Sequence, residues 1–379
     1  MQFTIKKEVF VKALAKVQPF SPVKNTMPIL SHVLLEVRDN LLYMTATDLE
    51  VGMKSFYPVV DAAEAGSISV SSKKLFEIVK EMPNEDIRFS TTDNDWAEIT
   101  SGKARFKIVG LSAEDFPLFQ TGEGEYINLG SDLLNDMIAK TSFAICTDET
   151  KYNLYGAFFQ VSKGYIRMIT SDGHRLVAAK KPITGANPAA LGKGVILPKK
   201  GVLELKKLAE EHPGGEIKLG FETNNVVAYT ENTTMVMRLV DGLFPDYKKV
   251  LPVGNDKKVA VDRGALLSSL KRMSILTSEK IKGVKFEVQK GSITMSACTP
   301  ETGECTEDVE AGYEGDDLVI SLNPKYLLDI ASVIPENSVH LRFKDAITPV
   351  IVKSAGDDFL AILMPMNLNS TQAPAPAQA

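Results

Sequence analysis

Asp172, His174 and Arg175 are the residues whose types could do acid–base chemistry, because they lie close together in the run TSDGHRLVAAK (170–180). In a hydrolase relay, an aspartate orients a histidine that activates a serine. Here Asp172 and His174 are two residues apart with no nucleophile between them, and Ser171 lacks the Gly-x-Ser-x-Gly turn that exposes a nucleophilic hydroxyl. We therefore reject the hydrolase hypothesis and expect a turn at a strand end, in which Asp172 holds backbone amides.

The sequence contains no motif for a metal ion, a disulfide framework or a nucleotide. Cys146, Cys298 and Cys305 form no Cys-x-x-Cys pair, and the other histidines lack metal-ligand spacing. No Gly-x-x-x-x-Gly-Lys-Ser/Thr loop is present, so we expect no cofactor and no ATP hydrolysis. No apolar run reaches the roughly 18 residues of a membrane span, and MQFTIKKEVF does not resemble a secretion signal. These features favour a cytoplasmic protein without membrane contact.

Six segments share one pattern, a short alternating strand followed by a helix with apolar residues three and four apart. Three of them begin at Phe3 (FTIKKEVFVKALAKVQPF), Tyr126 (YINLGSDLLNDMIAKTSFAI) and Lys258 (KVAVDRGALLSSLKRMSIL). The other three alternate with them and are SISVSSKKLFEIVKEM, GVILPKKGVLELKKLAEEHP and LVISLNPKYLLDIASVIP. Ser71 or Ser72 and Asn323 are good N-cap residues for two of the helices. Strand-like runs follow each helix, so the repeated unit is strand–helix–strands.

Taken in pairs, six such units predict three similar α+β domains of about 120 to 130 residues each. Proline and glycine cluster near Gly124 and in VLPVGND (250–256), which gives the domain boundaries. We expect an N-terminal domain at 1–124, a central domain at 125–252 and a C-terminal domain at 253–368. The Pro/Ala-rich residues 369–379 cannot form a core and are expected to be a disordered tail.

Charge is segregated between the predicted helices and the rest of the chain. The net charge is −5, which argues against a protein that simply coats nucleic acid. The helices expected at 6–18, 71–81, 131–142, 198–211, 262–273 and 323–333 together carry +6, so the remaining residues carry −11. If the helices share one face, that face attracts a polyanion. No motif for reading bases is present, which favours phosphate contacts that ignore sequence. The alternative is that the lysines only solvate exposed helix faces.

The chain resembles the bacterial DNA polymerase III β subunit family, the replicative sliding clamps, over residues 1–368. The resemblance rests on NTMPIL (25–30), TATDLEVGM (45–53), DFP (115–117), SDGHRL (171–176), VDGLFPDYKKVLP (240–252), SEKIKGVKF (278–286) and MPMNL (364–368). It implies a non-catalytic processivity factor whose three clamp domains place helices inside and antiparallel sheets outside. Two chains would close head to tail into a homodimer ring around duplex DNA. The implied partners are the DNA polymerase III α subunit, the clamp loader and other proteins with a clamp-binding motif.

The resemblance also assigns candidate site residues. The family's DNA-contacting positions fall on Lys24, Lys73, Asp148, Tyr152 and Asn153, with Lys200 nearby. At Asp148 and Asn153 the sequence departs from the family pattern, which has an uncharged polar residue and a second tyrosine there. The partner-peptide pocket maps onto Leu154, Ser171, Gly173, His174, Arg175, Leu176, Pro245, Lys249, Val250, Ile362, Met364, Pro365, Met366 and Leu368.

Ring closure would join an edge of the first domain to an edge of the third domain of the other chain. We expect Phe106, Ile275 and Leu276 at this interface, and the alternative for these apolar residues is ordinary core packing. A monomeric three-domain adaptor that binds peptides but not DNA is the remaining alternative function. The mass in solution distinguishes this adaptor from a dimeric ring.

Overall fold

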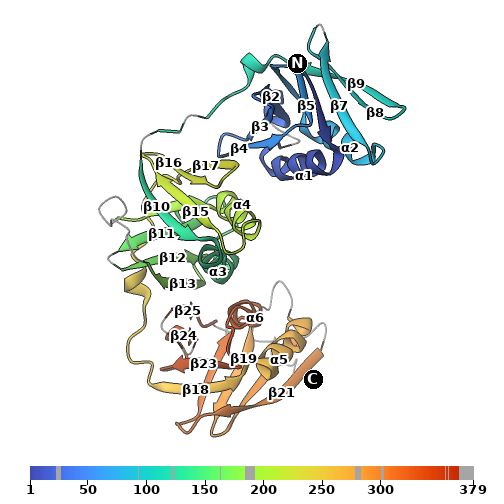
Figure 1. The fold of residues 1–379 in the computed structure, drawn as a ribbon. Helices are drawn as coiled ribbons and strands as arrows, with labels where there is room; N and C mark the ends of the chain where they lie inside the picture. The colour runs from blue at the N-terminus through green and yellow to red at the C-terminus, as the bar shows by residue number, and fades with distance from the viewer. Residues whose placement is uncertain are drawn as a thin grey trace, which may run out of the picture. The chain divides into compact units, whose positions relative to one another are not determined.

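The structure is a computed structural model that describes residues 1–22, 27–92, 94–119, 121–122, 124–162, 164–183, 193–277, 283–299, 303–354, 356 and 358–366 (Figure 1). The chain divides into two compact units, each built on one antiparallel sheet. The first unit takes residues 1–134 and 200–239, and the second takes 135–199 and the chain from 240 onward. Within the described ranges, no helix is both long enough and apolar enough to cross a membrane.

The first unit contains a sheet of 13 strands. In spatial order they are β10 (Glu125–Gly130), β15 (Glu216–Phe221), β16 (Asn225–Tyr229), β17 (Thr233–Arg238), β4 (Val51–Pro58), β3 (Leu41–Thr47), β2 (His32–Arg38), β6 (Gly66–Ser71), β9 (Ala104–Leu111), β8 (Trp96–Ser101), β7 (Asp86–Thr92), β1 (Gln2–Lys6) and β5 (Asp61–Glu64). The pairing of β17 with β4 joins strands from either side of the predicted boundary near Gly124.

The second unit contains a sheet of 12 strands. In spatial order they are β14 (Val195–Pro198), β11 (Gly156–Ser162), β12 (Tyr165–Ser171), β13 (Arg175–Pro182), β25 (Phe359–Leu363), β24 (Val350–Lys353), β23 (Ser338–Phe343), β18 (Lys257–Asp262), β21 (Gly303–Gly312), β20 (Ser292–Thr299), β19 (Val284–Gln289) and β22 (Leu318–Leu322). Here β13 pairs with β25, so this sheet also continues past a predicted domain boundary.

Each of the six predicted units begins with a strand that leads directly into a helix, which confirms the repeat. The helices are α1 (Lys7–Val17) after β1, α2 (Ser72–Glu81) after β6, α3 (Ser131–Thr141) after β10, α4 (Lys199–Glu210) after β14, α5 (Arg263–Leu276) after β18 and α6 (Pro324–Ser332) after β22. Ser71 caps α2 by accepting from the Lys74 amide, and Asn323 caps α6 by accepting from two amides. The two expected caps are therefore confirmed, with Ser71 rather than Ser72 at the N-cap.

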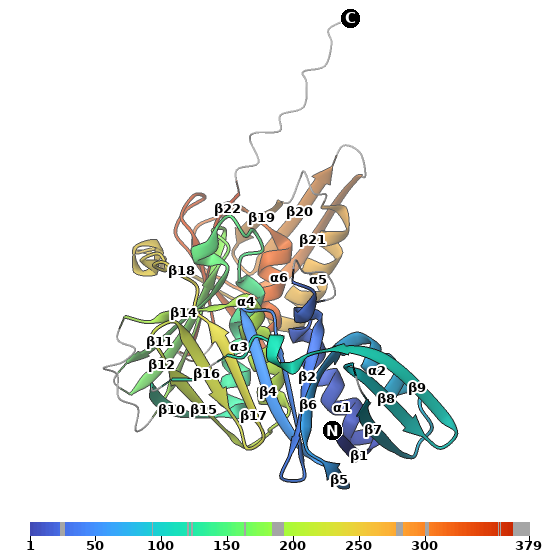
Figure 2. The same ribbon diagram turned by 90° about the horizontal axis from the view of Figure 1, so that it is seen from above.

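Four of the helices pack in two pairs, one pair in each unit, and bury their apolar faces against the sheets. In the first unit α1 contacts α2, and Figure 2 shows both beside the strands of that sheet. Phe3 of β1 stacks on Phe89 of β7 at 5.2 Å and meets Phe10 of α1 edge-on. In the second unit α5 contacts α6, and both bury leucines against the sheet around Phe286. Burial of these faces is the main term that stabilises each unit.

A network of four charges joins α3, β13 and the segment before β25. Lys140 is paired with Asp136 at 3.0 Å and Asp358 at 3.5 Å, and Lys181 contacts the same two carboxylates at 2.8 and 2.9 Å. Burial raises the pKa of Asp358, but the hydrogen bond from Lys181 and the charges of both lysines outweigh burial and lower it. Burial lowers the pKa of Lys181, whereas its bonds to the two carboxylates raise it above the usual range. The network therefore stabilises the unit between acid and alkaline limits.

We predict that Asp358→Asn lowers the apparent Tm by a few degrees at neutral pH, because a charge network of this exposure contributes roughly 1 kcal/mol. The folded-state pKa of Asp358 lies below its unfolded value near 4. Its contribution is therefore complete above that value and is lost as pH falls through the folded pKa.

Thermal unfolding followed from pH 2 to 7 measures this contribution. The acid slope should be shallower in Asp358→Asn than in Asp317→Asn, a control at an exposed aspartate. Identical slopes in the two variants would contradict the role of the network.

Candidate functional site

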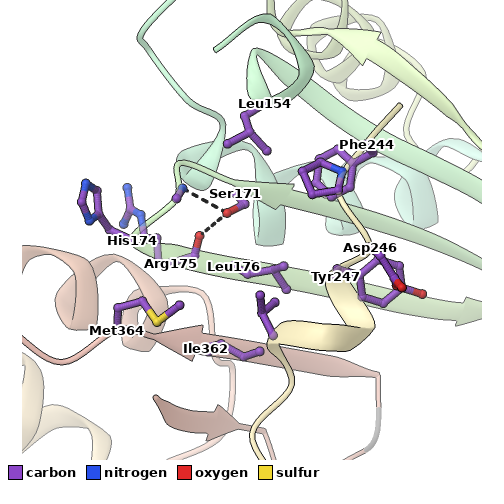
Figure 3. A pocket seen from close by; sticks show the side chains of 13 residues that line it. Leu154, Ser171, His174, Arg175, Leu176, Phe244, Asp246, Tyr247, Ile362 and Met364 are labelled. Atoms are coloured by element: carbon purple, nitrogen blue, oxygen red, sulfur yellow. Dashed lines mark hydrogen bonds between the residues drawn. The ribbon is translucent and has the colours of Figure 1, made fainter. Parts of the chain in front are cut away.

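A cavity of about 160 Å³ opens in the second unit beside the SDGHRL turn (Figure 3). Four parts of the chain meet there: the 3-10 turn Tyr152–Leu154, the turn between β12 and β13, the segment after Val240, and the end of β25. The lining residues are Leu154, Ser171, Gly173, His174, Arg175, Leu176, Phe244, Pro245, Asp246, Tyr247, Val250, Ile362 and Met364.

The turn is fixed by hydrogen bonds made within five residues. Oδ1 of Asp172 accepts from the amides of His174 at 2.9 Å and Arg175 at 3.0 Å. The Ser171 hydroxyl donates to the Arg175 carbonyl at 2.8 Å and accepts from the Gly173 amide at 3.1 Å. Gly173 has φ of +92°, a backbone conformation that favours glycine. The expected role of Asp172, to hold backbone amides, agrees with this geometry.

Arg175 anchors the turn to the C-terminal half of the unit. Its side chain is 8% exposed and donates to Asp172 at 3.0 Å, to Asp329 of α6 at 2.7 Å and to the Phe143 carbonyl at 2.8 Å. The guanidinium also lies 4.4 Å from the centre of the Tyr326 ring. Burial and the nearby Asp172 carboxylate raise the pKa of Tyr326. Because each of its three side-chain nitrogens already donates a hydrogen bond, Arg175 serves as a rigid wall of the cavity.

The same contacts leave no acid–base relay at this turn. The Asp172 carboxylate is held by two amides and Arg175, and the Ser171 hydroxyl is bonded to a carbonyl. The His174 ring stacks on Tyr326 with a centroid distance of 6.4 Å, and Figure 3 shows it pointing away from the cavity. A nucleophile, base and orienting acid in mutual contact are what a hydrolase requires. The geometry therefore agrees with rejection of the hydrolase hypothesis.

The floor of the cavity is apolar. Ile169, Leu176 and Ile362 form a buried cluster against which Phe244 and Tyr247 pack. The Phe244 ring stacks on Phe158 at 5.2 Å, so the segment after Val240 is attached to the sheet through aromatic side chains. Figure 3 shows the Phe244 and Tyr247 rings on the opposite side of the cavity from Met364. An apolar floor with a few fixed polar groups at its rim is typical of a ligand site.

Most of the predicted pocket residues meet at this cavity, and a few lie outside its lining. Lys249 is in the 3-10 turn Tyr247–Val250, where its side chain is highly exposed and 3.8 Å from Asp246. Pro365 and Met366 follow β25, and the Met366 amide donates to the Ser321 carbonyl at 2.8 Å. Leu368 lies outside the described residues.

Three lining residues, Phe244, Asp246 and Tyr247, were missed from the sequence. Their signal was present in the aromatic residues that flank Pro245 in GLFPDYKKV.

The predicted DNA-contacting residues differ in the exposure of their side chains and in whether these already have a partner inside the protein. Tyr152 is 61% exposed, and Lys73 on α2 is exposed at 3.9 Å from Glu77. The carboxylate of Asp148 accepts from the hydroxyl and amide of Thr150, which lower its pKa. Lys200 forms an ion pair with Asp48 inside the first unit.

Two further residues complete this set. Asn153 is partly buried in the 3-10 turn Tyr152–Leu154, and Lys24 lies outside the described residues. Lys73 and Tyr152 are therefore the best exposed candidates, whereas Lys200 must give up an internal partner to bind phosphate.

Many cations on the helices are already paired inside the protein. The pairs include Lys7 with the Met82 carbonyl, Lys16 with Glu211, Lys206 with Glu210, Lys207 with Glu204 and Arg272 with Glu307. Lys12, Lys80, Lys271 and Lys325 are exposed and have no side-chain partner within the described ranges. The count of +6 already subtracts Glu204, Glu210 and Glu211, but the partners of Arg272 and Lys200, Glu307 and Asp48, lie outside the predicted helices, so these two pairs lower the charge available to a polyanion.

The predicted interface residues are not core residues. Phe106 on β9 is 45% exposed, Ile275 near the end of α5 is 78% exposed, and Leu276 is partly buried. Residues 104–109 of β9 pair with β8, and within the described chain their other edge has no strand partner. β21 has a similar edge at residues 303–310. An unpaired strand edge with exposed apolar residues is a ready surface for another chain.

Comparison with known proteins finds similarity along nearly the whole chain. Residues 1–120, 128–246 and 248–367 match the N-terminal, central and C-terminal domains of the DNA polymerase III beta subunit. The chain is 36% identical to the beta sliding clamp of Pseudomonas putida over 372 residues, which cover 97% of this chain and 100% of that protein.

Solved structures give the same result. The crystal structure of the DNA polymerase III subunit beta from Pseudomonas aeruginosa is similar with a TM-score of 0.92 and 35% identity, covering 97% of this chain and 100% of that one. A sliding clamp from the same organism bound to griselimycin has the same TM-score, identity and coverage.

We predict that Asp172→Ala loosens the turn, because two amides lose their acceptor and the buried Arg175 loses one carboxylate. Loss of such partners costs about 1–3 kcal/mol of local stability. Hydrogen exchange at the amides of His174 and Arg175 measures the change and should become faster. Asp172→Asn is the matched control, since its side-chain oxygen still accepts from the amides while the charge is lost. Unchanged protection in Asp172→Ala would contradict this role of Asp172.

Proposed function

Because the chain belongs to the DNA polymerase III beta subunit family, we propose that the cavity beside the SDGHRL turn is where it holds its protein partners. Members of this family are sliding clamps, so the chain is a non-catalytic processivity factor. It encircles duplex DNA as a dimer ring and tethers the replicative polymerase and other replication and repair proteins. The ring is incompatible with the monomeric adaptor that remained the alternative from the sequence.

The observation that carries the proposed site is the combination of an apolar floor with a rigid polar turn. Ile362 and Leu176 offer a buried apolar surface, and Arg175 fixes the wall beside it. A short peptide with apolar side chains would bury them on this floor, each contributing about 1.5–3 kcal/mol. Met364 lies at the rim, and a flexible methionine adapts to peptides of different shape. We assign the same role to Pro365 and Met366, which follow β25, and to Leu368.

We further propose that DNA is held loosely, through phosphates. Lys73 and Tyr152 are exposed, and the lysines on α1, α2, α5 and α6 that have no side-chain partner among the described residues add weak attraction. Contacts that neutralise few phosphates ignore sequence and permit sliding. Lys24, Asn153 and Lys200 are secondary candidates, and Asp148 would repel a phosphate unless its neighbour Lys151 compensates.

For ring closure we propose that the free edge of β9 meets the free edge of β21 of the second chain. Phe106 and Ile275 would then be covered, and Leu276 would pack beside them. The three domains are proposed to divide at residues 124 and 252, with the tail at 369–379. The cytoplasm is the compartment that suits a bacterial replication protein with three cysteines that form no disulfide within the described residues.

We predict that Met364→Glu weakens binding of the DNA polymerase III α subunit by at least about tenfold, because it puts a carboxylate beside an apolar floor. Surface plasmon resonance with the intact protein measures the affinity. Lys344→Glu is a matched control, since Lys344 is exposed and does not line the cavity. In both variants native mass should remain twice 41.4 kDa. Unchanged polymerase affinity in Met364→Glu would refute the pocket.

We predict that Lys24→Glu combined with Lys73→Glu lowers loading onto closed circular DNA by roughly tenfold at moderate salt, because two phosphate contacts become repulsive. Dimerisation should not change. Lys200→Gln should affect loading less, since Lys200 is already paired with Asp48. Retention on closed circular DNA, compared before and after linearisation, is the measurement. A dissociated dimer in the double variant would contradict the DNA assignment.

A further inference from the structure

The SDGHRL turn has a structural counterpart in the first unit, between β3 and β4. Oδ1 of Asp48 accepts from the amides of Glu50 at 3.0 Å and Val51 at 2.7 Å. The Thr47 hydroxyl donates to the Val51 carbonyl at 3.2 Å and accepts from the Leu49 amide at 3.0 Å. These are the same four bonds that Asp172 and its neighbours make in the second unit.

The neighbouring strand is paired in the same register at both places. In the second unit Leu176 lies opposite Ile362, and in the first unit Gly52 lies opposite Val236. Both pairs stand one residue after the last residue of the turn. The pairing of β13 with β25 and the pairing of β4 with β17 therefore match residue by residue.

Each of these two strand pairings is followed by a backbone hydrogen bond between equivalent residues. The Met364 amide donates to the His174 carbonyl at 2.9 Å, and the Arg238 amide donates to the Glu50 carbonyl at 2.8 Å. Arg238 thus occupies in the first unit the position that Met364 occupies at the rim of the proposed peptide pocket. A Phe-Pro pair occurs near each turn: Phe244 and Pro245 line the first cavity, and Pro117 lines a second cavity beside β4 and β17.

A cavity of about 330 Å³ opens beside the pairing of β4 with β17. Its lining residues differ in chemical type from those of the first cavity. Gly52 replaces Leu176, and a Cβ added to Gly52 would lie 2.6 Å from the Phe119 ring, so the ring covers the strand there. Leu49 and Leu118 line the cavity and are 52% and 62% exposed. Leu49 has φ of +75°, a strained conformation for a leucine that the Asp48 bonds maintain.

Among the described residues that line this cavity, Arg238 is the only cation. Its side chain is exposed and has no hydrogen bond, ion pair or ring contact with any residue that the structure describes. A guanidinium in a hollow is suited to bind a carboxylate through two parallel hydrogen bonds. Glu50 lines the same cavity, so a polyanion such as DNA is disfavoured and a single acidic group is preferred.

We propose that this cavity is a second peptide-docking site, which takes a partner segment with one acidic side chain beside leucine-like residues. The carboxylate binds Arg238, and the apolar side chains cover Leu49 and Leu118. This second site rests on the proposed function, because it is inferred by comparison with the peptide-binding role of the first cavity. The two sites would select different partners, because one presents Met364 and the other Arg238 at the same structural position.

The test uses the intact protein carrying Met364→Glu, so that the first cavity is blocked. The probes are two capped peptides, acetyl-Gly-Asp-Leu-Leu-Gly-amide and the same peptide with Asn in place of Asp. Methyl NMR of Leu49 and Leu118 follows each titration. The Asp peptide should shift both residues and bind at least about tenfold more tightly than the Asn peptide, because a charge-assisted bond is lost in the latter.

Arg238→Gln should reduce the affinity for the Asp peptide to that for the Asn peptide. Arg238→Met, which copies the first cavity, should also abolish the preference for Asp. Unchanged methyl signals elsewhere show that these variants fold.

Three outcomes would overturn the proposal. These are equal binding of the two peptides, no shift at Leu49 and Leu118, or the same shifts produced by inorganic phosphate alone. Failure of the first cavity would instead appear as unaltered polymerase binding in Met364→Glu, so the two ideas fail separately.

Discussion

The candidate site depends on the register in which β13 pairs with β25. Leu176 lies opposite Ile362, which turns both side chains onto the cavity floor. Because side chains alternate between the faces of a sheet, a slip of one residue would remove Leu176 from the floor. The Asp172 turn and the Met364–His174 backbone bond, both at the end where β13 begins and β25 ends, oppose such a slip. Recognition is therefore built on strand pairing, and the loop contributes only the side chains at the rim.

The strand register is fixed in the same way at two places in this chain, beside Asp172 and beside Asp48, but the side chains there differ. The backbone bonds around Asp48 and Asp172 agree within a few tenths of an ångström, although the sequences TDLEV and SDGHR share only the aspartate. The repeated fold supplies the backbone, and substitutions at the equivalent positions then set the chemistry of each hollow. An apolar floor with Met364 suits apolar peptides, whereas an arginine at the same position changes which groups bind. Similar architecture thus does not imply similar ligands.

Apolar spacing in the sequence predicted the six strand–helix units, and the caps at Ser71 and Asn323 followed from residue type. Those features depend on contacts a few residues apart. The pairing of β17 with β4 could not be read in this way, since it joins residues about 180 positions apart. The same limit applies to Lys200, whose partner Asp48 is 152 positions away. Phe244 and Tyr247 were missed because their role appears only when their segment packs on β11 and β12.

The positive charge of the helices must be judged together with the carboxylates that form ion pairs with their lysines and arginines. Counting charges gave the helices +6, a sum that already includes the carboxylates paired with Lys16, Lys206 and Lys207, whereas Lys200 and Arg272 are paired with Asp48 and Glu307 outside the predicted helices. Paired lysines contribute little to the attraction of phosphate, and within the part of the chain that the structure describes few unpaired cations remain on the helices. A ring needs no strong contacts with DNA, because its closure around the duplex keeps it there. Weak attraction that centres the duplex without fixing it is then an advantage, since each additional strong phosphate contact would slow sliding.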